Sequence, residues 1–294
     1  MLTAAEDRYR ARVAVQVLSF FLLSIGLPST DPPPAVAQGP DKADVAREST
    51  LRRVRPFRIR VLTYNIHHGQ GIDGKLDLER IARVILSVEP DLVTLQEVDR
   101  NTQRTLLVDQ PAELARLTKM HVVFGDNIAF QGGQYGNAVL SQFSIRRHEN
   151  HALPTLDQGE QRGVLEAEVE LPDKQSSFLM LATHLDHRRN ARERIASAVA
   201  INNLIARRGD TAALLAGDLN AIPGSTTLVE LAKQWKRANE QIAPTIPVGK
   251  PTRQIDYVMF RPVERWKVVE TKVLDEAVAS DHRAVLAVLD LQSP

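Results

Sequence analysis

The chain has 294 residues, of which 43% are hydrophobic and 25% charged, the balance of an ordinary globular protein. A net charge of +1 gives no strong field toward nucleic acid or an anionic membrane surface. The absence of cysteine excludes disulfides, thiolate catalysis and zinc sites built on cysteine, although it leaves the compartment open.

The N-terminus has the parts of a secretory signal, and we expect residues 1–37 to be removed. A basic stretch, residues 8–12, precedes the apolar run VAVQVLSFFLLSIGL, residues 13–27. That run is shorter than the roughly 20 residues needed to span a bilayer. An A-x-A pattern ends at Ala37, so cleavage before Gln38 would export the protein to the periplasm or the medium. The alternative is an uncleaved N-terminal membrane anchor.

Residues 38–56 show no hydrophobic periodicity, and we expect them to be a solvated linker. From residue 57 the chain alternates strand and helix patterns without another linker, which predicts one domain over 57–294. No internal sequence repeat is visible, which argues against a solenoid.

Hydrophobic periodicity predicts the elements of this domain. In chain order we expect a strand at 58–66, a helix at 76–88, a strand at 91–97, a helix at 110–120, strands at 121–125, 135–141, 162–171 and 176–184, a helix at 188–208, a strand at 212–220, a helix at 226–235, and strands at 255–260, 266–274 and 282–291. Asp77 is a candidate cap for the first helix, and Pro111 suits the first turn of the second. The order indicates sheets packed together and covered by helices.

Polar side chains stand where these strands end or begin. Four strands finish in a carboxylate, an amide or an imidazole: the residues are Asn65, Glu97, His184, Asp218 and Asn220. Later strands begin with such groups, namely Asp256, Asp281 and His282, and two more begin near Asn137 and Arg162. If the later strands run antiparallel to the earlier ones, all of these groups meet at one edge. Each residue alone fits a turn, a helix cap or a buried histidine, but their repetition indicates a site.

The available side chains suit phosphate ester cleavage with a divalent cation. Hard oxygen ligands without a thiol favour Mg²⁺ or Mn²⁺, for which Glu97 and Asp281 would be enough. Two histidines and an aspartate supply proton transfer and donors to the nonbridging oxygens. Serine-hydrolase and zinc-protease chemistry fit poorly, because neither a G-x-S-x-G nor an H-E-x-x-H motif occurs.

The short motifs TYNI, LQEVD, GNAVLS, THLD, GDLNA, QIDYV and SDHRAV occur in this order and cover nearly all of 57–294. Together they resemble the endonuclease/exonuclease/phosphatase superfamily, whose members have the DNase I-like fold. The resemblance implies an α/β four-layer sandwich, in which two packed mixed β-sheets are flanked by helices. It also implies a divalent-metal phosphoesterase that acts by in-line attack of an activated water.

The resemblance carries over residue by residue. It implies a site for Mg²⁺ or Mn²⁺ at Asn65, Glu97 and Asp281, and catalytic roles for His184, Asp218, Asn220, Asp256 and His282. Within this set His184 matches the phosphate-contacting histidine, and Asp256 matches the residue that orients His282. Asp218 and Asn220 match the pair that handles the nucleophilic water, and the base is either Asp218 or His282. Asn137 and Arg162 are expected to bind the substrate.

The sequence favours a lipid or small-molecule phosphodiester as substrate. Aromatic residues make up 5% of the chain and the charge is near neutral, whereas nucleases need basic or aromatic insertions to grip their substrate. The segments YNIHHGQG and GKLDLERIA also resemble a branch of the family that includes proteins linked to GPI-anchor lipid remodelling. The alternatives are a secreted DNA or RNA endonuclease and a catalytically silent binding module. No stable protein partner is implied, and a monomer is expected.

Two further segments allow two interpretations each. Arg188 or Arg192 either contacts a substrate phosphate or lies on a solvated helix face, with an Arg189–Glu193 pair beside it. FQGGQYGN, residues 130–137, either forms a rim loop over the substrate or a plain hairpin connection.

His67 and His68 directly follow the first predicted strand, near the expected mouth of the site. Because adjacent residues on a strand point to opposite faces, we expect no more than one of these rings to face the site. Contact of either ring with the substrate stays open.

Overall fold

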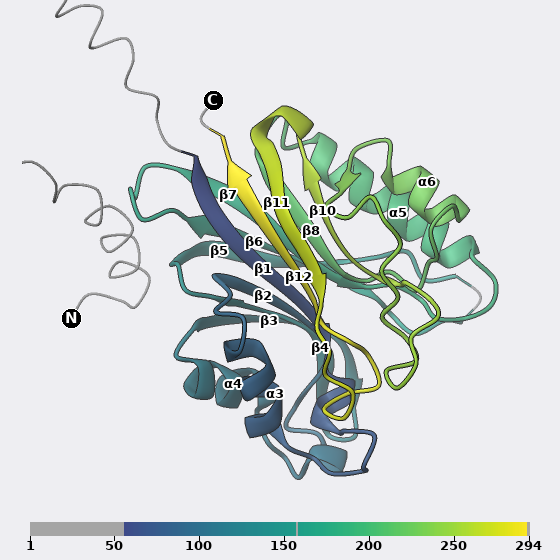
Figure 1. Cartoon of the computed structure of the whole chain (residues 1–294). Helices are drawn as coiled ribbons and strands as arrows, with labels where there is room; N and C mark the ends of the chain where they lie inside the picture. Colours follow the sequence, from purple (N-terminus) through teal and green to yellow (C-terminus); the bar gives the residue numbers. More distant parts are fainter. Residues whose placement is uncertain (1–55, 157, 293–294) are drawn as a thin grey trace, which may run out of the picture. The chain divides into compact units, whose positions relative to one another are not determined.

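The computed structural model describes residues 56–156 and 158–292 (Figure 1). The predicted signal sequence and the linker up to residue 55 lie outside the described residues, so the predicted boundaries of both stay predictions. Over the described ranges the chain forms two six-stranded β-sheets and four α-helices. No helix in these ranges is long and apolar enough to cross a membrane.

The first sheet has the strand order β11-β12-β1-β2-β4-β3. Its strands are β1 (Phe57–Asn65), β2 (Leu92–Arg100), β3 (His121–Phe130), β4 (Gly133–Ser141), β11 (Trp266–Val273) and β12 (Val285–Leu291). β1 and β2 run parallel, with the helix α3 (Leu78–Leu86) crossing between them, and the other pairs are antiparallel. The sheet is therefore mixed, as predicted.

The second sheet has the strand order β5-β6-β7-β8-β10-β9. Its strands are β5 (Ile145–Ala152), β6 (Gly163–Glu170), β7 (Ser177–His184), β8 (Ala213–Asp218), β9 (Lys236–Arg237) and β10 (Asp256–Arg261). It repeats the plan of the first sheet, because β7 and β8 run parallel with the helix α5 (Arg192–Ala206) between them. Its other pairs are antiparallel.

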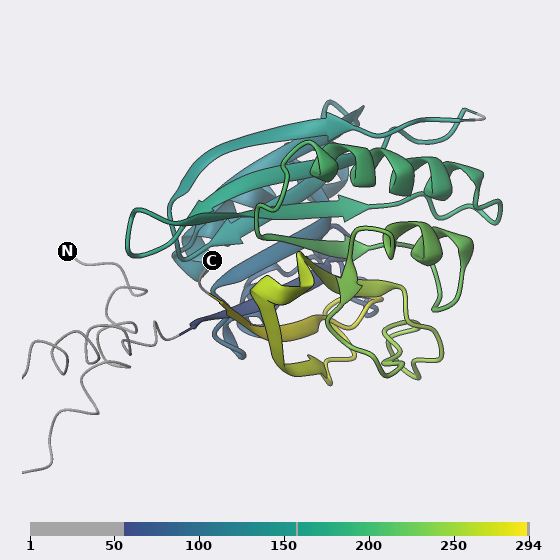
Figure 2. The same ribbon diagram turned by 90° about the horizontal axis from the view of Figure 1, so that it is seen from above.

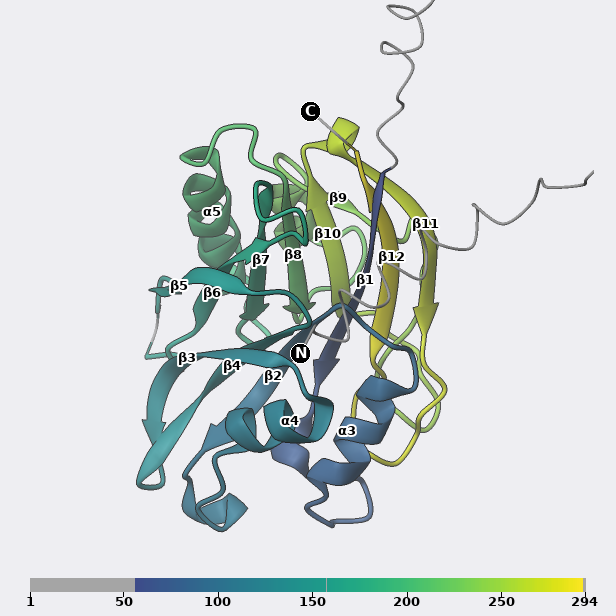
Figure 3. The same ribbon diagram turned by 90° about the vertical axis from the view of Figure 1, so that its left-hand side faces the viewer.

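The two sheets pack against each other and carry helices on their outer faces. α3 and α4 (Gln110–Thr118) share a buried apolar cluster with the first sheet, and α5 and α6 (Thr226–Leu231) share one with the second. Figure 1 shows the two helix pairs on opposite sides of the sheets. Figure 2 shows α5 and α6, in green, along the second sheet, and Figure 3 shows α4 beside β2, β3 and β4. The predicted four-layer sandwich is confirmed.

Local sequence explains where the first two helices begin. Asp77 caps α3, because its Oδ1 accepts a hydrogen bond from the main-chain N–H of Arg80 at 2.7 Å. Pro111 lies in the first turn of α4, where its missing N–H leaves no hydrogen bond unmade, and Asp109 caps this helix. Both features agree with the sequence expectation.

Several elements differ from that expectation. β2 continues past Glu97 to Arg100, β3 continues to Phe130, α6 ends at Leu231 instead of residue 235, and β12 begins at Val285 instead of residue 282. β5 was not predicted, because its sequence IRRHENHA has no apolar alternation and the strand lies exposed at the edge of its sheet. β9 has two residues, too few to leave a pattern. The long helix begins at Arg192 instead of residue 188, because the side chain of Asn190 accepts the N–H of Arg192 in a preceding turn. Residues 130–137 form a plain hairpin between β3 and β4.

A β-bulge in β2 positions one functional side chain. The pairing of β2 with β4 shifts between Leu95 and Val98, so an extra residue enters β2. Glu97 lies inside this bulge and has a left-handed backbone with a φ of 58°. Bulges redirect side chains and are common next to active sites. Glu97 is partly exposed here, although its strand is otherwise largely buried.

Candidate active site

Three neighbouring strands of the second sheet bring polar side chains to the same level. His184, the last residue of β7, pairs in register with Asp218, the last residue of β8. Asp256, the first residue of β10, pairs with Asp218 from the other side, because β10 runs antiparallel to β8. All three side chains are buried. The strand directions therefore place these three residues together.

Asp218 is the centre of the cluster. Its Oδ2 lies 3.5 Å from Nε2 of His184 and 3.6 Å from Nε2 of His282. The same oxygen accepts a hydrogen bond from Nδ2 of Asn65 at 3.2 Å, and Asn65 belongs to the other sheet. Its Oδ1 accepts the main-chain N–H of Asn220 at 2.9 Å. Groups from both sheets thus hold one buried carboxylate.

His282 and Asp256 form a buried ion pair beside Asp218. Nδ1 of His282 lies 3.0 Å from Oδ2 of Asp256, and Oγ1 of Thr245 donates to the same oxygen at 2.5 Å. Burial lowers the pKa of His282, but the negative charges of Asp256 and Asp218 outweigh it and raise the pKa to about 10. The imidazole of His282 is therefore protonated at neutral pH.

Asp218 binds a proton more readily than an ordinary aspartate. Burial, and then the charge of Asp256, raise the pKa of Asp218 to about 7, against the opposing charge of His282. A carboxylate with a pKa near the working pH can both accept and release a proton. The cluster therefore contains one group suited to proton transfer and one fixed positive charge.

Arg162 fixes the ring of His184. Nη1 of Arg162 lies 3.1 Å from Nδ1 of His184, and Nη2 lies 3.4 Å from Nδ1 of His187. A guanidinium only donates, so Nδ1 of His184 accepts and the ring proton is on Nε2, which faces Asp218. Burial, and then the charge of Arg162, hold the pKa of His184 well below its usual value, so the ring is neutral. Nδ2 of Asn220 lies 3.1 Å from the same Nε2, but it donates to the main-chain O of Leu185 at 3.0 Å and makes no hydrogen bond with a protonated Nε2.

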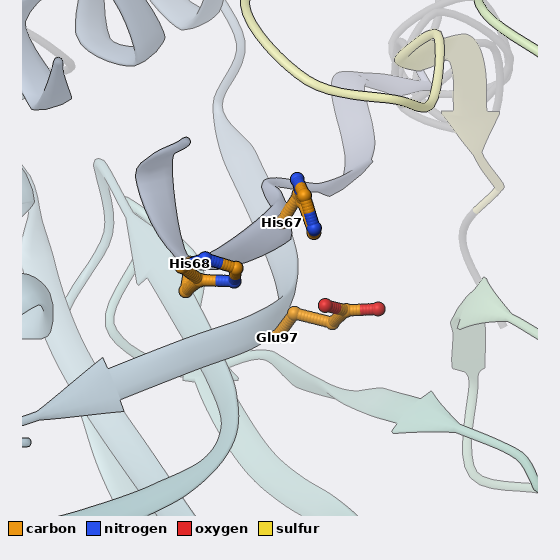
Figure 4. A group of neighbouring side chains, drawn as sticks. All are labelled: His67, His68 and Glu97. Carbon is orange, nitrogen blue, oxygen red and sulfur yellow. The ribbon is translucent and has the colours of Figure 1, made fainter. Parts of the chain in front are cut away.

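Glu97 occupies the more open end of the cluster. Nδ2 of Asn65 donates to Oε1 of Glu97 at 3.0 Å, while Oδ1 of Asn65 accepts the main-chain N–H of His67 at 3.1 Å. Asn65 therefore joins Glu97 to Asp218 and presents its amide nitrogen to both carboxylates. The rings of His67 and His68 lie beside Glu97 (Figure 4). Direct metal binding by Asn65 stays a prediction.

Asp281 and Asn137 lie around this centre. Ser280 precedes Asp281, and its Oγ donates to the main-chain O of Asn65 at 2.7 Å and lies 3.3 Å from Oδ1 of Asp281. Asp281 is therefore next to the end of β1. Asn137 is fully buried, and its Nδ2 donates to the main-chain O of Gly163 at 3.2 Å, which links β4 to the second sheet. Their roles in metal and substrate binding stay predictions.

Arg188 lies in the turn before α5, and its guanidinium contacts two acids. Its Nε is 2.8 Å from Oδ1 of Asp186, and its Nη2 is 2.5 Å from Oε2 of Glu193. Glu193 pairs with Arg188 here, and the expected pair with Arg189 does not form in the described part of the chain. The pair given with the solvated-face interpretation is therefore wrong, and contact of Arg188 or Arg192 with a substrate phosphate stays a prediction.

The acidic groups near Glu97 fit a divalent cation. One amide, that of Asn65, bridges the carboxylates of Glu97 and Asp218. Among residues 56–156 and 158–292, no lysine or arginine forms an ion pair with Glu97. Carboxylate oxygens with uncompensated negative charge are the ligands that Mg²⁺ and similar hard cations prefer.

Two contacts at the site had no role in the sequence prediction. Thr245, which donates to Asp256, lies in an irregular segment without a motif, so no signal was available for it. Ser280 is the first residue of the SDH motif, which was noted for its acid and its histidine. The hydroxyl of Ser280 fastens this motif to the end of β1.

Comparison with known proteins gives consistent results. The sequence model of the endonuclease/exonuclease/phosphatase family matches residues 62–282. The uncharacterized protein YbhP of Escherichia coli K12 is 28% identical over 224 residues, which cover 71% of this chain and 87% of YbhP. The solved structure of an endonuclease/exonuclease/phosphatase from Beutenbergia cavernae is 27% identical, with a TM-score of 0.66 over 80% of this chain and 72% of that one.

A more distant structure shares the fold. The mannosyl-6-phosphatase Bt3783 of Bacteroides thetaiotaomicron is 18% identical, with a TM-score of 0.67 over 79% of this chain and 99% of that one. The matched family segment, 62–282, contains every residue of the cluster around Asp218, from Asn65 to His282. The chain therefore belongs to the endonuclease/exonuclease/phosphatase family, whose members are generally phosphoester hydrolases.

Proposed function

We propose that this protein is an exported, Mg²⁺- or Mn²⁺-dependent phosphodiesterase that hydrolyses a lipid or small-molecule diester. The supporting observation is the position of Asp218 between two histidines, with Asn65 joining it to Glu97. A proton acceptor, Asp218, a positive charge, His282, and an oxygen ligand for a cation, Glu97, therefore lie close together. Water attacks phosphorus in line, the opposite P–O ester bond breaks, and the products are a phosphomonoester and an alcohol.

Glu97 and Asp281 would hold the divalent cation, with Asn65 beside them. Mg²⁺ usually keeps several waters and needs only one or two carboxylates, so this set is sufficient. When bound, the cation supplies Lewis-acid stabilisation of the negative charge on the phosphoryl and leaving oxygens. The remaining chemistry belongs to side chains of the second sheet and its neighbours.

Of the two candidate bases, Asp218 is favoured. The pKa of His282, at about 10, keeps its imidazole protonated at neutral pH, so this ring cannot accept a proton from water. The pKa of Asp218, at about 7, leaves a large share of its carboxylate free to do so. We therefore assign proton removal to Asp218 and charge stabilisation to His282, which Asp256 and Thr245 hold in place.

His184 and Asn220 are suited to bind the nonbridging phosphate oxygens. Arg162 keeps the ring proton of His184 on Nε2, the atom that faces Asp218. Nδ2 of Asn220, a second donor, lies 3.1 Å from this Nε2. Donors fixed in advance around a developing negative charge are a large source of rate enhancement.

Two observations support a small or lipid diester. The connection between β3 and β4 is a short hairpin, and the chain is nearly neutral, whereas binding to a duplex depends on many phosphate contacts by lysine and arginine. Nuclease activity is therefore the alternative function, and the experiment described below distinguishes it from hydrolysis of a small or lipid diester.

Export is proposed from the basic stretch, the apolar run and the A-x-A pattern of the N-terminus. We expect material from the periplasm or the culture medium to begin at Gln38. N-terminal sequencing of that fraction is the measurement, and finding Met1 there would refute cleavage.

Activity is tested on the full chain with Mg²⁺ or Mn²⁺ and a panel of bis-p-nitrophenyl phosphate, phosphatidylinositol, sphingomyelin, plasmid DNA and RNA. Hydrolysis of a small or lipid diester that falls about 100-fold or more in Glu97→Gln and in His282→Asn supports the proposal. His148→Ala, at an exposed position of β5, is the control and should keep the wild-type rate. Rates that survive both site substitutions contradict the proposed site. Nicking of plasmid that depends on the same residues would make nucleic acid the substrate.

A further inference from the structure

His67, His68 and Glu97 form a separate cluster of metal-ligand side chains at the edge of the active site. One ligand atom of each residue lies within 4.8 Å of the ligand atoms of the other two. The two imidazole rings are in edge contact, with their centroids 4.4 Å apart. Figure 4 shows both rings on the side of the Glu97 carboxylate, with a ring nitrogen of each histidine turned toward it. All three residues are partly exposed, so an ion can enter from solvent.

Both histidines reach the cluster because they do not lie on a strand. They begin a short 3-10 turn, η1 (His67–Gly69), in which φ is 45° at His67 and 44° at His68. The expectation that no more than one ring would face the site is therefore wrong. Glu97 also has a left-handed backbone, with a φ of 58°. Non-glycine residues rarely adopt this conformation, and such strain concentrates at functional sites.

The hydrogen bonds of the rings leave the nitrogens that a metal needs. Nδ1 of His67 lies 3.1 Å from the main-chain O of Gln70, and a carbonyl only accepts, so Nδ1 carries the proton and Nε2 keeps its lone pair. Metal-binding histidines generally show this arrangement. Nδ1 of His68 is buried and has no hydrogen-bond partner among the described residues.

The turn that carries the histidines is held at both ends. The main-chain N–H of His67 donates to Oδ1 of Asn65, and the main-chain O of His68 accepts from Nε2 of Gln110 at 2.7 Å. Oε1 of Gln110 accepts the main-chain N–H of Asp99 at 2.9 Å, which fastens the turn to β2, the strand that carries the carboxylate. The ligand groups are therefore ordered before an ion arrives, which lowers the cost of binding it.

We propose that His67, His68 and Glu97 bind a second divalent cation of the zinc class, which shares Glu97 with the Mg²⁺ position. Two imidazoles and one carboxylate form a three-ligand set used by zinc sites that keep an open fourth position. Imidazole nitrogen favours Zn²⁺, Co²⁺ and their neighbours over Mg²⁺. Because Glu97 also belongs to the proposed Mg²⁺ site, this inference rests on the proposed function and extends it.

The test measures Co²⁺ binding to the metal-free full chain in excess Mg²⁺. Mg²⁺ fills the oxygen-ligand position, so the visible absorption of Co²⁺ reports the imidazole site. We expect one Co²⁺ per chain that Zn²⁺ displaces. The double variant His67→Asn/His68→Asn should bind Co²⁺ at least about 100-fold more weakly, because asparagine is a poor ligand for this ion. Asparagine is chosen because it tolerates a left-handed backbone. The matched control is His121→Asn/His148→Asn, at two exposed positions, and should bind like the wild type.

Wild-type affinity in His67→Asn/His68→Asn overturns the inference, and so does the absence of Co²⁺ uptake by the wild type in Mg²⁺. A thermal melting curve, recorded by circular dichroism, checks that the double variant folds. If it does not fold, Glu97→Gln takes its place and must weaken Co²⁺ binding as well. Hydrolysis in Mg²⁺ alone is measured on the same wild-type sample. Co²⁺ binding without any hydrolysis refutes the proposed function, whereas hydrolysis with unchanged Co²⁺ binding in the variants refutes only the second metal position.

Discussion

Nε2 of His282 lies 3.6 Å from Oδ2 of Asp218, while Nδ1 of the same ring lies 3.0 Å from Oδ2 of Asp256. One buried imidazole therefore stands between two buried carboxylates. If the imidazole and both carboxylates are ionised, the buried cluster carries one net negative charge, which is unfavourable away from water. The cluster responds by binding protons more tightly, which raises the pKa of both His282 and Asp218. This relationship sets the pH dependence of the reaction on both sides.

On the acid side, we expect kcat/KM for diester hydrolysis to fall below about pH 7. Burial and the charge of Asp256 raise the pKa of Asp218 to about 7, so acidification protonates the group that accepts a proton from water. The fall should approach about tenfold per pH unit. The profile is measured with Mg²⁺ between about pH 5 and 9, with Asp218→Asn as the inactive reference. A profile that stays flat to the acid end would show that another group is the base.

On the alkaline side, Asp256→Asn should lower the pH at which activity is lost. In the wild type, the charge of Asp256 overcomes the effect of burial and keeps the pKa of His282 at about 10. Without this carboxylate the pKa of His282 falls, because burial is then opposed only by the charges of Asp218 and Asp281. The alkaline limb of kcat should therefore move to lower pH in a profile measured on both proteins. An alkaline limb at the same pH in both proteins would contradict a role for the imidazolium.

Arg162→Lys should lower kcat by about 10- to 100-fold and change KM less. Lysine keeps the positive charge but lacks the rigid fork that contacts both His184 and His187. Nδ1 of His184 then loses its fixed donor, and the ring proton is no longer confined to Nε2. The ¹⁵N NMR shifts of the imidazole show which nitrogen is protonated, and this readout separates positioning from general loss of structure.

The control for this substitution is Arg147→Lys, because Arg147 is an exposed arginine of β5 that pairs with Glu168. It should leave both kcat and the imidazole shifts unchanged. If Arg162→Lys also leaves the His184 tautomer unchanged while kcat falls, Arg162 acts on the substrate directly.

Much of the site could be predicted from sequence because strand direction decides which chain ends meet. His184 and Asp218 finish parallel neighbouring strands, and Asp256 begins the antiparallel neighbour of the second. The sequence shows both the type of each residue and the approximate end of each strand. The meeting of these three side chains could therefore be predicted from the pattern of apolar and polar residues. The two packed mixed sheets followed from the same alternation together with the family resemblance.

Other features depend on distances that no local pattern encodes. The choice between Asp218 and His282 as base requires the burial of both groups and their separation from Asp256. The joint placement of His67 and His68 requires consecutive left-handed residues, neither of which is glycine, so their sequence indicated a strand end instead of a turn. An edge strand such as β5 needs one good pairing partner and little burial, so its composition resembles a loop.

Gly217 directly precedes Asp218, at the point where β8 lies against β7. A Cβ at this position would stand 1.8 Å from the main-chain O of Thr183, so alanine forces the strands apart where His184 and Asp218 pair. We expect Gly217→Ala to lower the free energy of unfolding by about 3 kcal/mol or more, with loss of activity. Gly224→Ala is the control, because φ is +83° there but no atom lies within 4 Å of an added Cβ, so the loss should be about 1 kcal/mol. Urea unfolding compares the two variants, and equal losses would mean that backbone conformation, and not the close approach of the strands, requires glycine before Asp218.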